Sequence, residues 1–235
     1  IVGGHTASGY WVDNNRATTI EGLYAAGDVA GGCPQKYVTG ALAEGEIAAE
    51  AILEYLNGKD DDRIAAENKE EALERGGEQE LSQTAIAKKA EYESHLNASR
   101  SLMNAEQLEE AMQKIMDQYA GGIGTDYRYS GMSLAKADEK IAALLPVVDT
   151  LAATDTYELM QIYELCERLI VCQAVIAHLA ARKETRWHSF GENTDYPQQS
   201  EEWMKYVNSR MENGKIRILY RDLITKESAD SNTVA

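Results

Sequence analysis

The stretch TTIEGLYAAGDVAGGCPQKYVTGALAEGEIAAEAI, residues 18–52, decides the fold that we expect for this chain. A short apolar run, residues 23–26, leads into Gly27-Asp28, a glycine-rich loop and then an alanine-rich helix. This order lets the backbone approach a ligand closely and leaves a carboxylate at the end of a strand. The free N–H groups of the following helix would favour an electron-rich or anionic ligand. The residues alone leave two interpretations open, a nucleotide site or a tight turn without a ligand.

The composition indicates a globular chain with a strongly acidic balance. Among 235 residues, 39 Asp and Glu stand against 23 Lys and Arg, for a formal net charge of −16. That charge repels phosphate backbones and anionic lipids, so we expect no nucleic-acid or membrane-surface role. No long apolar run and no signal-type leader occurs, so no membrane span is expected. The three cysteines are widely spaced, which predicts no metal site and favours a reducing, cytoplasmic compartment.

The first 58 residues combine short apolar runs with a helix, which predicts a piece of an α/β layer. The segments HTASGYWVD, residues 5–13, and TIEGLYAAGD, residues 19–28, are typical of strands separated by a polar turn. Apolar residues recur at helical spacing over residues 39–58, and Gly58 is expected to end that helix. We therefore predict a first domain over residues 1–58.

The remaining residues, 59–235, are predicted to form a mainly α-helical bundle with an irregular tail. A highly charged segment is expected to end at Gly76-Gly77, and Asn104 is a good N-cap for the amphipathic helix that follows. Apolar periodicity predicts three helices, over residues 105–119, 133–152 and 156–184. Residues 215–223 are typical of a terminal strand.

Several of these motifs resemble the flavoprotein subunits of the fumarate reductase/succinate dehydrogenase family. GLYAAGDVAGG, residues 22–32, followed by TGALAEGEIAAEAI, resembles the family's C-terminal FAD-binding signature. HTASGYWVD is similar to the H-x-x-x-G-G strand that precedes this signature. CPQKYVTGALAEG, residues 33–45, and RKETRWHSFGENTDYPQQSEEWMKYVNSR, residues 182–210, resemble segments of the adenylylsulfate reductase type within the family. The resemblance covers about residues 1–222 of the chain.

The resemblance implies that the first domain is the C-terminal part of an FAD-binding, Rossmann-like domain. It places Asp28 at the ribityl or ribose hydroxyls of FAD, and Gly27 where the chain passes close to the cofactor. The backbone amides around Gly40, Ala41 and Leu42 would lie at the pyrimidine edge of the flavin. Donors at that edge stabilise negative charge on the reduced ring.

The resemblance also implies residues that act on a small-molecule substrate. His5 aligns with a pocket histidine beside the flavin, and Lys36 falls where the dicarboxylate enzymes carry a substrate-binding Arg. Arg grips a carboxylate through two hydrogen bonds whereas Lys offers a point charge, so Lys36 favours the adenylylsulfate reductase type. Arg186 matches the family's Arg after the long helix, and both a substrate contact and an inter-domain salt bridge remain open for it.

Two further histidines and one cysteine are expected to have no catalytic or binding role. His95 stands in charged sequence and is expected to be solvated. His178 lies on an apolar helix and is expected to pack there or to reach the surface. Cys33 has no second cysteine close in sequence, so we expect neither a redox pair nor a metal site around it.

The implied function is that of an FAD-dependent oxidoreductase α subunit, represented here by its C-terminal part. Such an enzyme interconverts adenylyl sulfate with AMP and sulfite and exchanges electrons with an iron–sulfur, ferredoxin-like β subunit. The chain has no G-x-G-x-x-G motif for the pyrophosphate, so we expect a missing N-terminal FAD-binding half and no turnover by the chain alone. Two alternatives stay open, a fumarate reductase or succinate dehydrogenase-like flavoprotein, and a non-catalytic helical interaction module with a degenerate flavin half-site.

Overall fold

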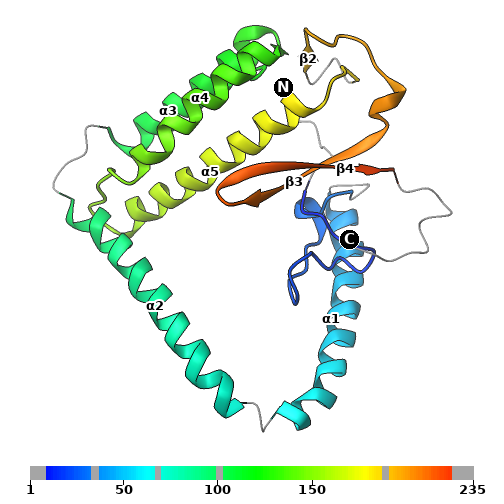
Figure 1. Cartoon of the computed structure of the whole chain (residues 1–235), viewed down its shortest axis with the longest axis vertical. Coiled ribbons are helices and arrows are strands. Elements are labelled where there is room, and N and C mark those ends of the chain that lie inside the picture. Colours follow the sequence, from blue (N-terminus) through cyan, green and yellow to red (C-terminus); the bar gives the residue numbers. More distant parts are fainter. Residues whose placement is uncertain (1–8, 33–36, 67–69, 99–102, 187–190, 224–235) are drawn as a thin grey trace. The chain divides into compact units, whose positions relative to one another are not determined.

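A computed structural model shows that the chain is mainly helical (Figure 1). The structure describes residues 9–32, 37–66, 70–98, 103–186 and 191–223. Its helices are α1 (Val38–Ala66), α2 (Glu70–Asn97), α3 (Ala105–Tyr119), α4 (Gly131–Val148) and α5 (Thr156–Ala181). Its strands are β1 (Arg128–Tyr129), β2 (Glu192–Asn193), β3 (Lys205–Glu212) and β4 (Lys215–Asp222), and its 3-10 turns are η1 (Gly27–Val29), η2 (Ile123–Thr125) and η3 (Glu201–Trp203).

The contacts that residues make in space divide the chain into two compact units. The first unit comprises residues 1–81 together with 224–235, and the second unit comprises residues 82–223. The boundary falls within α2. Residue 58, where the sequence places the domain boundary, lies inside α1. The division into domains at that residue stays a prediction.

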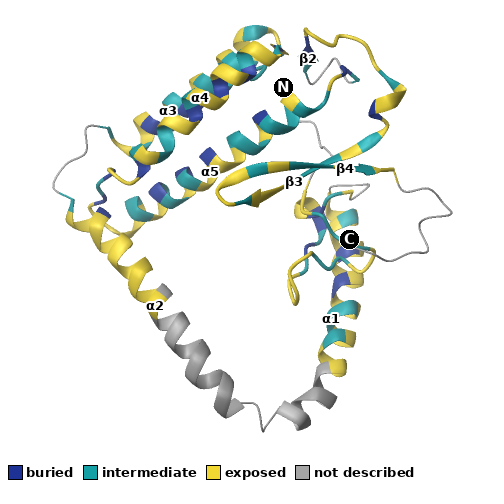
Figure 2. Ribbon diagram, viewed as in Figure 1, coloured by how far each residue is buried: buried dark blue, intermediate teal, exposed yellow. Residues whose placement is uncertain are grey.

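The hydrophobic core of the second unit lies among α3, α4 and α5 (Figure 2). Each of these helices turns one apolar side inward and leaves charged residues outside, as amphipathic periodicity requires. The helical bundle predicted from that periodicity is confirmed. The buried core residues are Leu108, Met112, Tyr129, Leu134, Ala137, Ile141, Val148, Leu151, Ala153, Ile162, Leu165, Leu169 and Ile176.

Side-chain caps fix where these helices begin. Asn104 Oδ1 accepts the Gln107 N–H at 2.8 Å, and Gln107 Oε1 accepts the Asn104 N–H at 3.0 Å, so the predicted N-cap is confirmed as a capping box. Asp155 Oδ1 accepts the N–H groups of Tyr157 and Glu158, each at 2.9 Å, at the start of α5. These contacts satisfy amides that a helix cannot pair within itself.

Two small sheets complete the second unit. β3 and β4 form an antiparallel hairpin in which Lys205 pairs with Asp222 and Glu212 with Lys215. The terminal strand predicted at residues 215–223 is confirmed as β4, whereas its partner β3 was not anticipated. β1 and β2 pair in parallel over two residues each.

The described part of the first unit contains bridges where the sequence predicted strands. Residue pairs Tyr10–Ala30, Val12–Thr18 and Ala17–Tyr24 form single bridges. Extended segments become strands only beside a neighbour that continues the hydrogen-bond ladder, and these pairings are one residue long. The Rossmann-like α/β fragment therefore stays a prediction.

Two predicted helix ends are wrong. Gly58 lies inside α1, which continues to Ala66, and Gly76-Gly77 lies inside α2. A glycine ends a helix by adopting a left-handed φ, and Gly58 does not adopt one. None of the helices in the described part of the chain combines the length and the apolar character that a membrane span needs.

Candidate functional site

The glycine that follows the apolar run of residues 23–26 is held in a conformation that a side chain would oppose. Gly27 is buried at the start of η1 and has a φ of +72°. A Cβ atom placed there would meet the Cβ of Ala41, in the first turns of α1, at 3.1 Å. Both the left-handed backbone and the close approach of α1 therefore require glycine at this position.

A buried carboxylate on α1 fixes this turn. Glu44 is 4% exposed, and its Oε2 accepts the N–H of Gly27 at 2.9 Å. Its other oxygen, Oε1, lies 3.6 Å from Nε of Arg16. Neither Oε1 nor that Nε has a hydrogen-bond partner among the described residues. Glu44 thus ties α1 to the Gly27 turn and places a paired charge behind it.

A turn earlier in the chain presents Arg16 to this carboxylate. Asp13 Oδ1 accepts the N–H groups of Asn15 at 2.8 Å and Ala17 at 2.9 Å, which closes a side-chain-capped turn. Arg16 sits in that turn with a φ of +66°. Its carbonyl accepts the N–H of Ala25, two residues before Gly27. The polar turn at residues 13–16 therefore supports the Gly27 loop in two ways. The Arg16 carbonyl accepts a backbone hydrogen bond from Ala25, and the Arg16 side chain forms an ion pair with Glu44.

Sequence reasoning missed Glu44, although a signal was present. Ala48, one helical turn later, is buried on the same side of α1. A charged residue in phase with the inward face of a helix needs a buried partner. A charged Glu44 on the inward side of α1 therefore indicates a buried polar partner, which the structure shows to be the Gly27 N–H.

The proposed flavin-contact residues lie around this turn. Asp28 follows Gly27 directly and is exposed, and Leu42 is 70% exposed in the first turns of α1. The N–H of Ala41 donates to the carbonyl of Tyr37 at 2.9 Å, so the amides that helix geometry leaves unpaired precede it and include Gly40. Two predicted substrate-side residues, His5 and Lys36, and also Cys33, lie outside the described residues.

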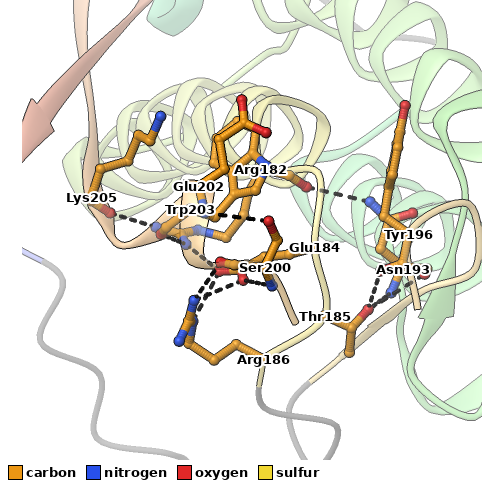
Figure 3. Close-up of polar contacts among 10 residues, drawn as sticks. All are labelled: Arg182, Glu184, Thr185, Arg186, Asn193, Tyr196, Ser200, Glu202, Trp203 and Lys205. Carbon is orange, nitrogen blue, oxygen red and sulfur yellow. Dashed lines mark hydrogen bonds and ion pairs between the residues drawn. The ribbon is translucent and has the colours of Figure 1, made fainter. Parts of the chain in front are cut away.

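Arg186 belongs to a buried ion-pair network in the second unit (Figure 3). Glu184 is 2% exposed, and its Oε1 and Oε2 accept from Nε and Nη2 of Arg186 at 3.0 and 2.9 Å. Arg182 donates to Oε1 at 2.6 Å, and the Ser200 N–H donates to Oε2 at 3.1 Å. Burial is the largest influence and raises the pKa of Glu184, but the donors of Arg186, Ser200 and Arg182 together hold it below its ordinary value.

This network joins the end of α5 to the segment after it. Arg186 Nη2 also donates to the carbonyl of Ser200 at 3.0 Å, and Arg182 donates to the carbonyls of Trp203 and Lys205 at 2.9 and 2.8 Å. The Arg186 guanidinium therefore makes a salt bridge within its own unit. A contact between Arg186 and substrate stays a prediction.

A cleft of about 430 Å³ opens beside the network. The ammonium of Lys205 lies 5.1 Å from the ring centre of Trp203 and 5.9 Å from that of Tyr220, both within cation–π range. The two rings meet edge to face at 5.7 Å. The cleft is lined by Lys183, Tyr196, Ser200, Glu202, Trp203, Lys205 and Tyr220.

The two histidines that lie in described residues have structural partners. His95 is buried and its Nδ1 lies 2.7 Å from the carbonyl of Leu151, so the expectation that it is solvated is wrong. A carbonyl only accepts, which assigns the proton to Nδ1. His178 is half-buried with Nε2 2.8 Å from Ser209 Oγ, and burial together with the charge of Arg182 lowers its pKa. The described residues contain no cluster of metal-ligating side chains.

Comparison with known proteins identifies the family. Residues 109–233 match the family described as fumarate reductase flavoprotein C-term. The chain is 30% identical over 209 residues to the adenylylsulfate reductase subunit alpha of Megalodesulfovibrio gigas, covering 86% of this chain and 30% of that subunit. It is 27% identical over 205 residues to an FAD-dependent oxidoreductase of Methanocaldococcus jannaschii, covering 85% of this chain and 33% of the relative.

A solved structure agrees with the sequence relatives. The adenylylsulfate reductase of Archaeoglobus fulgidus superposes with a TM-score of 0.72 at 30% identity, covering 89% of this chain and 33% of that one. The chain therefore belongs to the fumarate reductase flavoprotein family of FAD-dependent oxidoreductases. It is similar to the C-terminal region of adenylylsulfate reductase α subunits and spans about a third of the length of these relatives.

Proposed function

We propose that this chain is the C-terminal part of an FAD-dependent oxidoreductase α subunit that interconverts adenylyl sulfate with AMP and sulfite. The family membership supports an FAD-dependent enzyme, and the similarity to adenylylsulfate reductase α subunits favours the sulfur substrate. Lys36 favours the same substrate, because a point charge replaces the two-pronged Arg that suits a dicarboxylate.

The hydrogen bond between Glu44 and the Gly27 N–H carries this proposal. It locks the Gly27-Asp28 turn against α1, so an exposed carboxylate and a helix N-terminus stand together on one rigid support. Burying a carboxylate costs free energy unless it is paired, and the pairing of Glu44 with the Gly27 N–H holds this turn in one conformation. The residues present therefore fit one edge of FAD.

Each residue has a definable part in holding the cofactor. Asp28 would accept hydrogen bonds from ribityl or ribose hydroxyls, and Gly27 would let the backbone pass beside them. Of the amides around Gly40, Ala41 and Leu42 that we expect near the pyrimidine edge, those before Ala41 would donate to the ring, because the Ala41 N–H already donates to Tyr37. When bound, FAD supplies reversible two-electron transfer.

The substrate side and the partners complete the proposal. His5 and Lys36 would orient the anionic substrate, and Arg186 would contact it or make an inter-domain salt bridge. An N-terminal FAD-binding half would hold the pyrophosphate, and a ferredoxin-like iron–sulfur β subunit would exchange the electrons. The spaced cysteines are consistent with a cytoplasmic enzyme.

The test uses the α subunit that contains this sequence, co-produced with its β subunit. We expect a yellow protein whose visible flavin absorption is bleached by sulfite and is unaffected by fumarate. Reoxidation of the reduced enzyme by fumarate, without a response to sulfite, would show a dicarboxylate enzyme instead. A colourless complex would leave the interaction module as the explanation.

A matched pair of substitutions tests the site itself. Asp28→Asn removes the acceptor charge proposed to face the FAD hydroxyls, and we expect retained flavin to fall about tenfold or more. Asp138→Asn makes the same chemical change at an exposed position on α4 and should leave flavin content unchanged. Equal flavin content in both variants would contradict the role of Asp28.

A further inference from the structure

The outer face of the β3–β4 hairpin is basic although the chain has a formal net charge of −16. Residues directly opposite in an antiparallel pair share a face, and successive pairs alternate between faces. One face therefore carries four basic side chains and a single carboxylate. This basic face consists of Tyr206, Asn208, Arg210, Glu212, Lys215, Arg217, Leu219 and Arg221.

The opposite face of the hairpin is the one that packs on α5. Ser209 Oγ lies 2.8 Å from Nε2 of His178, and the hydroxyl of Tyr220 donates to the carbonyl of Ala181 at 3.5 Å. Ser209 and Tyr220 alternate with the residues of the basic face along their strands. The basic face therefore points away from α5.

The centre of the basic face holds two arginines in direct opposition. Arg210 pairs with Arg217 across the strands, and each side chain is 57% exposed. Like charges directly opposite each other destabilise a hairpin. Both form ion pairs with Glu212, whose pKa is lowered by the hydrogen bond from Arg217 and by the charge of Arg210. One carboxylate against two guanidiniums leaves a positive excess that a further anion would relieve.

A third guanidinium on this face is already ordered. Arg221 stacks on the ring of Tyr206 at 5.4 Å and donates from Nε to Oδ1 of Asn208 at 3.1 Å. Ordering a cation before binding reduces the entropy lost when a partner arrives. A planar guanidinium suits a carboxylate, which accepts two parallel hydrogen bonds, and Arg210 and Arg217 present two such groups on this face.

We propose that the basic face docks an acidic patch on the surface of a partner protein. A strand of eight residues is about 26 Å long, which matches a protein–protein contact of small size. Charge complementarity indicates the kind of partner. A compact group of carboxylates matches the four basic side chains, whereas the remainder of the chain is acidic. A long nucleic-acid polyanion extends beyond the hairpin and is repelled by that remainder. This proposal does not depend on the identity of the substrate.

The test measures binding of a fluorescent deca-glutamate peptide to the full chain by anisotropy. We expect binding that weakens several-fold when ionic strength rises from about 0.05 to about 0.3 M. Arg210→Gln together with Arg217→Gln should weaken it about tenfold or more. The matched control is Lys114→Gln with Lys136→Gln, which removes two exposed ammonium groups from α3 and α4 and should leave binding unchanged.

Four results would overturn the proposal. The first is no peptide binding by the wild-type chain, and the second is an equal loss in the hairpin and control variants. Tighter binding of a single-stranded oligonucleotide than of the peptide would assign the face to nucleic acid. Salt-sensitive self-association that the arginine variants abolish would assign it to a second copy. Far-ultraviolet circular dichroism of each variant verifies that the hairpin substitutions leave the fold intact.

Discussion

The two units of the chain bury their apolar residues to very different extents. In the second unit, large side chains such as Leu108, Ile141 and Leu169 are fully enclosed between helices. In the described part of the first unit the buried residues are small or polar, while Val38 and Leu42 are 75% and 70% exposed. The second unit therefore has a core of enclosed large side chains, whereas the first unit buries no large apolar side chain among its described residues.

Truncating one leucine in each unit is the most direct way to break this comparison. Leu169→Ala empties a fully enclosed site in the second unit and should lower the free energy of unfolding by about 2–5 kcal/mol. Leu42→Ala removes an exposed side chain and should change it by less than about 0.5 kcal/mol. Urea denaturation measures both, and hydrogen exchange assigns the change to α3–α5. Similar losses in the two variants would show that the first unit is packed as tightly as the second.

The buried carboxylate of the second unit offers a second test of how strongly that unit is held together. Glu184→Ala leaves Arg182 and Arg186 without their shared anion, and it should cost about 2–4 kcal/mol of stability. The exposed pair between Lys136 and Glu139 supplies the control, because Glu139→Ala should cost less than about 1 kcal/mol. A loss for Glu184→Ala no larger than that of the control would show that the network contributes little to stability.

The lowered pKa of Glu184 predicts how this contribution depends on pH. Its pKa is lower in the folded chain than the ordinary 4.5, so unfolding takes up a proton. The stabilisation is fully present above about 4.5 and disappears as pH falls through the folded value. The difference in unfolding free energy between wild type and Glu184→Gln should therefore shrink in acid. A difference that is constant from pH 7 to pH 3 would contradict this assignment.

Sequence patterns predicted the second unit well because its determinants are local. Apolar residues at helical spacing define α3, α4 and α5, and Asn104 caps α3 through residues three positions away. The Glu184 network was not predicted, because its partner Ser200 is sixteen residues distant and no spacing announces such a pair. His95 was misjudged for the same reason, since Leu151 lies 56 residues further along the chain.

The first unit is harder to predict, because its structure depends on contacts between segments that lie far apart in the sequence. A turn at Gly27 is predictable, because a glycine between an apolar run and the start of a helix is a local signal, whereas its role at a cofactor stays a prediction. The strands were not confirmed, because a strand exists only with its neighbour. The helix end predicted at Gly58 is wrong, because glycine merely permits a left-handed φ and does not impose it.

The smallest expected effect concerns the cap of α3. Asn104→Ala removes the side-chain acceptor of the capping box and should lower the unfolding free energy by about 1 kcal/mol. Asn104→Asp keeps an acceptor at the helix N-terminus and adds a favourable charge, so stability should be retained or slightly raised. Hydrogen exchange at the first amides of α3 reports the local part of this change. Because α3 packs directly into the core, a loss of protection that reaches α4 and α5 would show that the second unit unfolds cooperatively. Loss of protection confined to α3 would show that this helix unfolds separately from the rest of the unit.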